Sequence, residues 1–157
     1  MEALARESLR IVHVDDDGDF VALSERRLKN AGFQHPIVRC EDGARAIDYF
    51  SMVEPQSAPH VILLDLHMPR VNGLEVLHWV RTVYRERNVA VYLLTSSEDP
   101  GDIRQAVSER VTKYLLKKSS LDELIENLDY IIKISNDPSL KEAEWFRLGY
   151  LSHDTKT

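Results

Sequence analysis

The chain has 157 residues, of which 43% are hydrophobic and 29% are charged, so it carries enough apolar material for one core but hardly for two. Its formal net charge of -6 argues against a nucleic-acid ligand, because proteins that hold phosphate backbones usually carry a basic surface. We therefore expect one domain that binds no nucleic acid.

Neither export nor membrane insertion is indicated by the apolar segments. Residues 1–10 alternate charged and apolar side chains, and so lack the continuous apolar stretch of a secretory signal. The longest apolar runs, such as 61–64 and 89–94, are far shorter than the roughly 20 residues that cross a bilayer. Cys40 stands alone and cannot form an internal disulfide. We expect a cytoplasmic protein that does not contact a membrane.

Short apolar runs alternate with helix-period segments along the chain. The runs lie at 9–14, 36–40, 61–64, 89–94 and 114–116, and the predicted helices at 17–31, 41–53, 73–86, 99–108 and 121–134. This alternation is typical of an α/β protein with a parallel sheet covered on both faces. We predict a doubly wound five-stranded parallel sheet of the flavodoxin-like order 2-1-3-4-5.

Two of the helices show which face should turn inward. In the first, the predicted inward positions are Phe20, Leu23, the stem of Arg27, and Leu28. In the third, they are Leu74, Leu77, Val80 and Tyr84.

Polar residues follow four of the predicted strands. Asp15-Asp16-Asp17 follow the first, Asp65 the third, Thr95 the fourth and Lys117 the fifth. Open α/β sheets bind ligands at the carboxyl ends of their strands, and the predicted strand order makes these four strands neighbours. Each residue alone has an ordinary structural explanation, such as a helix cap for Asp17. Together they predict one functional crevice.

The acidic residues of this crevice imply a cation. Carboxylates from Asp15, Asp16 and Asp65 would repel one another and raise one another's pKa unless a positive ion lay among them. Oxygen ligands without a histidine or cysteine cluster favour Mg²⁺, which also coordinates phosphate oxygens. Asp65 is then the candidate nucleophile toward phosphorus, with Thr95 and Lys117 as groups able to stabilise the transferred phosphoryl group.

The ordered motifs resemble the receiver domain of two-component response regulators over about residues 9–134. They are Val12-His13-Val14-Asp15-Asp16-Asp17, Val61-Ile62-Leu63-Leu64-Asp65-Leu66-His67-Met68-Pro69, Asn72-Gly73, Leu93-Leu94-Thr95-Ser96-Ser97 and Tyr114-Leu115-Leu116-Lys117. The resemblance implies a phosphoacceptor signalling protein, not an enzyme in the usual sense. Asp65 would take its phosphoryl group from a phosphohistidine of a sensor histidine kinase.

The same resemblance implies further roles. Asp15, Asp16, Asp65 and the backbone carbonyl of His67 would hold Mg²⁺, and Asp17 would be a helix cap. The resemblance also makes Thr95 and Lys117 ligands of the phosphoryl oxygens, Thr95 and Tyr114 switch residues, and His67 and Ser97 the residues that tune dephosphorylation. For Tyr114 and for the His67 and Ser97 pair, plain packing and plain loop exposure remain open.

Two residues depart from the family's usual pattern. Lys118 stands where proline commonly follows the pocket lysine, so a trans Lys117-Lys118 bond is favoured, which would move Lys117 or bring Lys118 toward the pocket. Arg110 stands where a glycine is common, so the loop before the fifth strand either avoids a left-handed residue or carries strain.

Residues 1–8 are expected to be an N-terminal extension, 9–134 the receiver domain and 135–157 a C-terminal extension too short for an output domain. The last segment is apolar and aromatic, and its candidate interface residues are Trp145, Phe146, Leu148 and Tyr150. A homodimer or partner contact and packing against the same chain are both open. The motifs are similar to those of stand-alone receivers that are phosphorylated by phytochrome-type histidine kinases (bacteriophytochromes).

Under this interpretation, a signal would pass by altered dimerisation, by partner binding or by relay to a downstream phosphotransfer protein. One alternative is a pseudo-receiver that binds partners without phosphorylation, which the Lys118 and Arg110 departures keep open. A haloacid-dehalogenase-type phosphatase is a remote alternative, because it requires a second aspartate two residues after the nucleophile, where this chain has His67.

Overall fold

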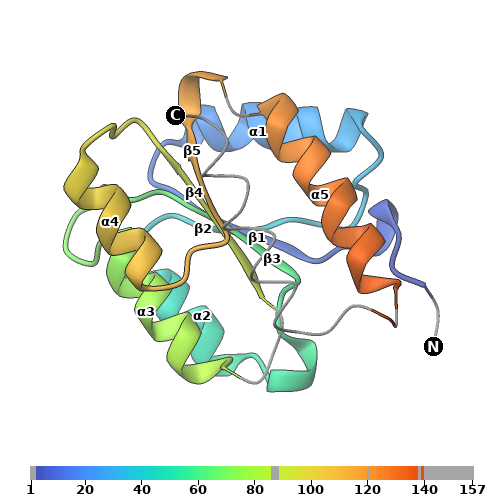
Figure 1. Ribbon diagram of the computed structural model, residues 1–157, viewed down its shortest axis with the longest axis horizontal. Coiled ribbons are helices and arrows are strands. Elements are labelled where there is room, and N and C mark those ends of the chain that lie inside the picture. The colour runs from blue at the N-terminus through green and yellow to red at the C-terminus, as the bar shows by residue number, and fades with distance from the viewer. Residues whose placement is uncertain (1–2, 86–88, 120, 138, 140–157) are drawn as a thin grey trace.

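The computed structural model describes residues 3–85, 89–119, 121–137 and 139. Its strands form one parallel sheet in the order β2-β1-β3-β4-β5, which confirms the predicted topology (Figure 1). The strands are β1 (Ile11–Val14), β2 (Val38–Cys40), β3 (Val61–Leu64), β4 (Ala90–Thr95) and β5 (Lys113–Leu116).

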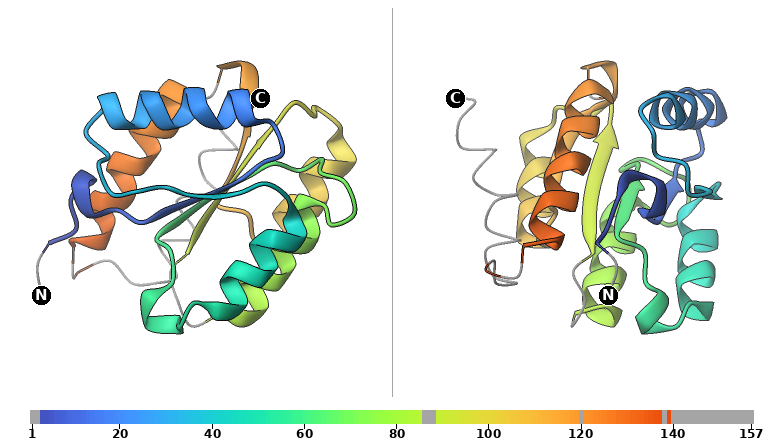
Figure 2. Two further views of the ribbon diagram at one scale, coloured as in Figure 1. Left: turned by 180° about the vertical axis from the view of Figure 1, so that it is seen from behind. Right: turned by 90° about the vertical axis from the view of Figure 1, so that its right-hand side faces the viewer.

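Helices cover both faces of the sheet. They are α1 (Gly18–Asn30), α2 (Gly43–Met52), α3 (Gly73–Val83), α4 (Pro100–Ser108) and α5 (Leu121–Ser135), with short 3-10 turns η1 (Arg6–Ser8), η2 (Pro55–Ser57) and η3 (Lys117–Ser119). Helices α1 and α5 lie on one face, and α2, α3 and α4 lie on the other (Figures 1 and 2). Helix α3 ends at Val83, earlier than the predicted residue 86, which itself lies outside the described part of the chain.

The core has two halves, one on each side of the sheet. Phe50 of α2, Leu77 and Val80 of α3, and Ala106 of α4 pack on one side. Leu28 of α1 and the apolar stripe of α5 pack on the other. Every residue of β3 and β4 is buried, as expected for strands with helices on both faces. No helix in the described ranges is long and apolar enough to span a membrane.

Four helices begin at the edge of the sheet where the strands end, each with a side-chain cap. Asp17 caps α1, Asp42 caps α2, Asn72 caps α3 and Asp99 caps α4, each through a side-chain oxygen that accepts a backbone N–H of the first turn. The expectation that Asp17 is a helix cap is confirmed, with the Phe20 N–H donating to its Oδ1 at 3.1 Å.

The predicted inward face of α1 is partly wrong. Leu28 is buried, but Leu23 is 39% exposed, while Val21 and Ser24 are buried in its place. Ser24 is tolerated there because its hydroxyl donates to the carbonyl of Phe20 at 2.8 Å. On α3, Leu77, Val80 and Tyr84 are buried as predicted and Leu74 is partly buried.

Arg110 adopts the left-handed conformation, with φ of 60°, so this loop keeps its turn at the cost of strain. The turn is closed by bonds from the N–H of Arg110 to the carbonyl of Val107 and from the N–H of Val111 to the carbonyl of Ala106, both 3.0 Å. The buried guanidinium of Arg81 also donates to the Arg110 carbonyl at 3.0 Å, and to the Val89 carbonyl at 2.5 Å. Sequence patterns did not predict this buried arginine.

Candidate functional site

The ends of β1 and β3 position two buried aspartates. The hydrogen-bond ladder of the sheet continues one residue past each strand, because Asp15 N–H donates to the Cys40 carbonyl and Asp65 N–H donates to the Val14 carbonyl. Asp15 is 4% and Asp65 is 6% exposed. With the exposed Asp16, they can place one carboxylate oxygen each within 4.8 Å of one another. The predicted acidic cluster is therefore formed.

Lys117 and Thr95 lie at the same edge of the sheet. The Nζ of Lys117 is 2.9 Å from Asp15 Oδ2 and 3.6 Å from Asp65 Oδ2. Thr95 ends β4 with no exposed surface, and its Oγ1 accepts the N–H of Ser97 at 3.2 Å. The ring of Phe20 lies 4.8 Å from Lys117 Nζ and forms an aromatic contact for the cation.

Gly73 is required where α3 passes the phosphoacceptor candidate. A Cβ on this residue would lie 2.3 Å from the backbone oxygen of Asp65, much closer than a carbon can approach. The N–H of Gly73 also donates to the Leu66 carbonyl at 2.8 Å. The start of α3 is thus packed directly against the backbone that carries Asp65.

The pocket perturbs the pKa values of its charged groups. The pKa of Asp65 is raised to about 6, chiefly by burial and next by the Asp15 charge, while Lys117 opposes the rise. Burial likewise raises the pKa of Asp15 above its ordinary value despite the contact with Lys117. Burial alone would lower the pKa of Lys117, but the two carboxylates raise it overall. The positive charge of Lys117 is therefore too small to offset the burial and mutual repulsion of the carboxylates in this cluster.

These properties fit a bound divalent cation. Carboxylates with upward-shifted pKa values gain from a positive charge, and the oxygen-only donors of Asp15, Asp16 and Asp65 suit a hard ion such as Mg²⁺. The three side chains supply few ligands, which leaves coordination positions for phosphate oxygens and water.

The departure at Lys118 leaves the site intact. Among the described residues there is no cis peptide bond, so Lys117-Lys118 is trans as favoured from the sequence. Lys117 nevertheless reaches the acidic pocket, and the expected displacement does not occur. Lys118 is not drawn into the pocket, because it is 73% exposed and pairs with Glu98 at 3.4 Å.

The remaining predicted site residues surround the pocket. The His67 side chain is exposed, and its Nε2 lies 3.3 Å from Asp102 Oδ2. The Tyr114 hydroxyl donates to the Ser97 carbonyl at 2.7 Å, and the Ser97 hydroxyl donates to Asp102. Trp145, Phe146, Leu148 and Tyr150 lie outside the described residues, so the expectation of an interface there stays untested.

Sequence reasoning missed two residues beside the pocket. His13 is 1% exposed, with its Nε2 3.9 Å from Asp15 Oδ2, and burial lowers its pKa to about 3, so it is neutral at pH 7. The two-residue period of a strand places His13 on the same side as Asp15, and this signal was available. Asp102 was also missed, because an acidic residue in a first helical turn is ordinarily explained by the helix dipole.

The doubly wound sheet and the acidic pocket at the ends of its strands together define a receiver-type signalling domain, and comparison with known proteins agrees. The family model described as "Response regulator receiver domain" matches residues 11–129. The chain belongs to the response regulator receiver family. Receiver domains act in two-component signal transduction and bind Mg²⁺ at their acidic pocket.

Among its relatives is the "Probable methanogenesis regulatory protein FilR2" of Methanothrix harundinacea. It is 34% identical over 129 residues, which cover 81% of this chain and 83% of FilR2. Other curated relatives are transcriptional regulators, and the chain spans only 52–60% of the length of several of these.

Solved structures include cyanobacterial relatives. Response regulator Rcp1 of Synechocystis is 28% identical over 119 residues, covering 74% of this chain and 81% of Rcp1. A solved structure of the Mn²⁺-bound form of response regulator Rcp1 superimposes with a TM-score of 0.65 at 25% identity, over 84% of this chain and 97% of the other. The phosphorylated cyanobacterial phytochrome response regulator RcpA gives a TM-score of 0.67 at 26% identity, over 84% and 96%.

Proposed function

We propose that the chain accepts a phosphoryl group onto Asp65 from a sensor histidine kinase, with Mg²⁺ bound by Asp15, Asp16, Asp65 and the backbone carbonyl of His67. The observation that carries this proposal is the meeting of Asp15, Asp16, Asp65 and Lys117 at one edge of the sheet. No simple structural role accounts for several carboxylates held so close together.

In the proposed transfer, a carboxylate oxygen of Asp65 attacks the phosphorus of a phosphohistidine. The new bond is P–O, and the broken bond is P–N, so the imidazole leaves with the bonding pair and takes up a proton. Lys117 Nζ, which lies 3.6 Å from Asp65 Oδ2, and the hydroxyl of Thr95 at the end of β4 would hold phosphoryl oxygens as negative charge spreads over them. Bound Mg²⁺ would supply charge neutralisation for the acidic residues and the phosphoryl oxygens.

The kinase and the output are the finer parts of the proposal. Similarity to Rcp1 and to the phytochrome response regulator RcpA supports a phytochrome-type histidine kinase as the donor. The signal would then pass by altered dimerisation, by partner binding or by relay to a phosphotransfer protein. Residues 135–157 are the proposed extension that contributes an interface, with Trp145, Phe146, Leu148 and Tyr150 as its candidates.

Incubation with acetyl phosphate or beryllofluoride and Mg²⁺ tests the acceptor. With acetyl phosphate, which releases acetate, intact-mass measurement should show one added phosphoryl group that is lost in Asp65→Asn and retained in Asp48→Asn, an exposed aspartate of α2; beryllofluoride should bind with the same dependence on Asp65. A folded wild-type chain without adduct and without beryllofluoride binding would instead favour a pseudo-receiver. Repeated turnover of a generic phosphate ester would favour a phosphatase.

Transfer from candidate kinases tests the partner. Phosphorylated phytochrome-type histidine kinase should transfer its label to the wild-type chain within the time that it transfers to its own regulator, and not to Asp65→Asn. Transfer from an unrelated sensor kinase at the same rate would contradict the phytochrome assignment. Light scattering before and after phosphorylation then reports any change in dimerisation.

A further inference from the structure

Asp102, in the first turn of α4, connects two loops of the site. Its Oδ2 accepts a hydrogen bond from the Ser97 hydroxyl at 2.7 Å and lies 3.3 Å from Nε2 of His67. Ser97 follows Thr95 by two residues, and His67 follows Asp65 by two. A single carboxylate oxygen therefore joins the loop after β3 to the loop after β4.

The two partners of Asp102 differ in how firmly they are held. Ser97 is fixed on several sides, because its N–H donates to Thr95 Oγ1, its carbonyl accepts from the Tyr114 hydroxyl, and its Oγ accepts the N–H of Asp99. The His67 side chain is 66% exposed, whereas that of Asp102 is 25% exposed. The imidazole is thus the partner with room to turn.

We propose that Asp102 is a positioning residue that holds the His67 imidazole on α4, and that a phosphoryl group on Asp65 competes with Asp102 for this imidazole. This inference rests on the proposed function of Asp65. It means that phosphorylation of Asp65 directly changes a contact made by helix α4.

The competition follows from hydrogen-bond stoichiometry. The Nε2 of an imidazole carries at most one hydrogen, so this nitrogen cannot donate to Asp102 and to a phosphoryl oxygen at the same time; the competition requires that Nε2, and not Nδ1, turns to the phosphoryl group. A phosphoryl group brings about -1.5 to -2 charges and three strong acceptor oxygens into the loop beside His67. When the imidazole turns to them, Asp102 keeps only the Ser97 hydroxyl, and the bridge between the β3–α3 loop and α4 opens.

Reciprocity makes the proposal measurable. If the phosphoryl group weakens the contact between His67 and Asp102, then removing Asp102 must strengthen the binding of a phosphoryl analogue by the same factor. Exposed polar side-chain contacts of this kind contribute modestly, which predicts an increase of about twofold to fivefold in affinity.

The experiment measures beryllofluoride affinity in the presence of Mg²⁺ by ¹⁹F NMR titration of the full chain. Asp102→Asn is compared with wild type, and both are repeated in the His67→Ala background. Glu98→Gln is the matched control, because it removes a negative charge from the loop that leads into α4, at a residue that pairs with Lys118 instead of His67. Asp102→Ala, which removes the acceptor completely, is a second variant.

We expect both Asp102 variants to bind beryllofluoride more tightly than wild type. In the His67→Ala background, this gain in affinity should shrink to the size of the Glu98→Gln effect. An equal change in both backgrounds, or a decreased affinity, overturns the inference while leaving Asp65 as the acceptor. A folded wild-type chain that binds no beryllofluoride overturns the proposed function itself. The side-chain ¹⁵N shifts of His67 should also change on beryllofluoride binding in wild type, and unchanged shifts count against the competition.

Discussion

Replacement of the buried Arg81 by methionine should destabilise the fold markedly. The side chain is 5% exposed, and its guanidinium donates to the carbonyls of Arg110 and Val89 at 3.0 and 2.5 Å, with a longer contact of 3.4 Å to Thr112 Oγ1. Methionine fills similar space but donates nothing. Each carbonyl that loses its partner costs about 1–3 kcal/mol, and relief from burying a cation offsets part of this.

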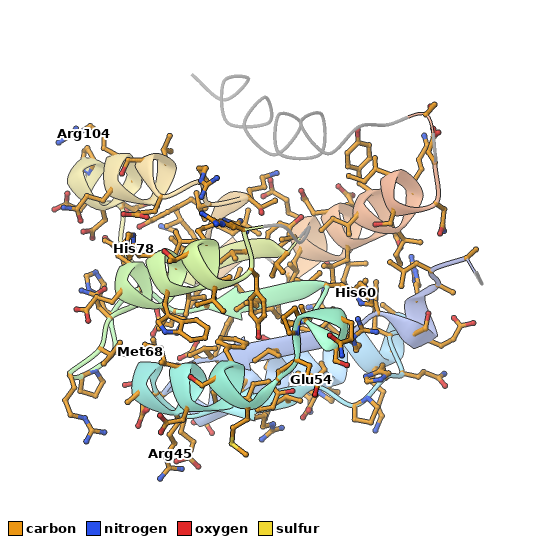
Figure 3. The ribbon with its side chains drawn as sticks, turned by 90° about the horizontal axis from the view of Figure 1, so that it is seen from below. Arg45, Glu54, His60, Met68, His78 and Arg104 are labelled. Carbon is orange, nitrogen blue, oxygen red and sulfur yellow. The ribbon has the colours of Figure 1, made fainter. Side chains whose placement is uncertain are left out.

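The net expectation is a loss of about 2–4 kcal/mol in the free energy of unfolding. Urea denaturation followed by circular dichroism measures this free energy. An unchanged m-value, the slope of the free energy of unfolding against urea concentration, would indicate that the same surface is exposed on unfolding. Arg104→Met, on the exposed surface of α4 (Figure 3), is the control and should change stability by less than about 0.5 kcal/mol. A loss below about 1 kcal/mol for Arg81→Met would refute the assignment of these carbonyls to the guanidinium.

Three further perturbations follow from the geometry. Arg110→Gly should stabilise the fold by about 0.5–1 kcal/mol in urea denaturation by relieving the left-handed strain, whereas Arg110→Ala should give no such gain. Burial lowers the pKa of His60 in the folded chain to about 4, so as the pH falls below about 6.5 this histidine takes up a proton in the unfolded chain before it does in the folded one. The free energy of unfolding should therefore decrease between pH 6.5 and pH 4, and by about 1–2 kcal/mol more in wild type than in His60→Gln. Gly73→Ala should weaken beryllofluoride binding at least tenfold, because its Cβ would collide with the Asp65 backbone. Gly18→Ala should bind normally, because the added carbon would meet no atom within 4 Å outside its own stretch of helix α1. Equal binding by the two alanine variants would contradict this reason.

His60 lies at the opposite end of the sheet from the acidic pocket, beside η2 (Figure 3). Its Nδ1 accepts the backbone N–H of Arg10 at 2.9 Å, which requires an unprotonated nitrogen. The pH dependence described for this residue is therefore a property of the fold and is separable from any titration of the phosphoacceptor pocket.

The strand order and the acidic cluster were predictable because both depend on backbone periodicity. Strands with apolar side chains on both faces had to be central, and residues that follow parallel strands had to meet at one edge of the sheet. This reasoning placed Asp15, Asp65 and Lys117 together before any contact was known, and the structure brings them within ion-pair distance.

Side-chain detail was less predictable, because it depends on contacts between distant segments. The pattern of α1 favoured Leu23 over Ser24, since it could not anticipate that the serine hydroxyl would bond to the helix backbone. The bridge from His67 to Asp102 likewise requires the relative positions of two loops, which no periodicity encodes. From the sequence, Arg81 is expected to be an ordinary exposed helix residue, and only the position of the loop around Arg110 in the fold explains its burial.

The two ladder bonds that continue past β1 and β3 have a consequence for amide hydrogen exchange. Because the N–H of Asp65 is held by the carbonyl of Val14, the backbone segments that carry the two aspartates cannot separate without breaking a hydrogen bond between β1 and β3. The part of the carboxylate repulsion that side-chain rotation does not relieve therefore acts on the backbone of these two central strands. A cation that neutralises the two carboxylates should slow exchange at the amides of Asp15 and Asp65 more than at those of β2 or β5, so the protection pattern of the sheet reports the charge state of the pocket.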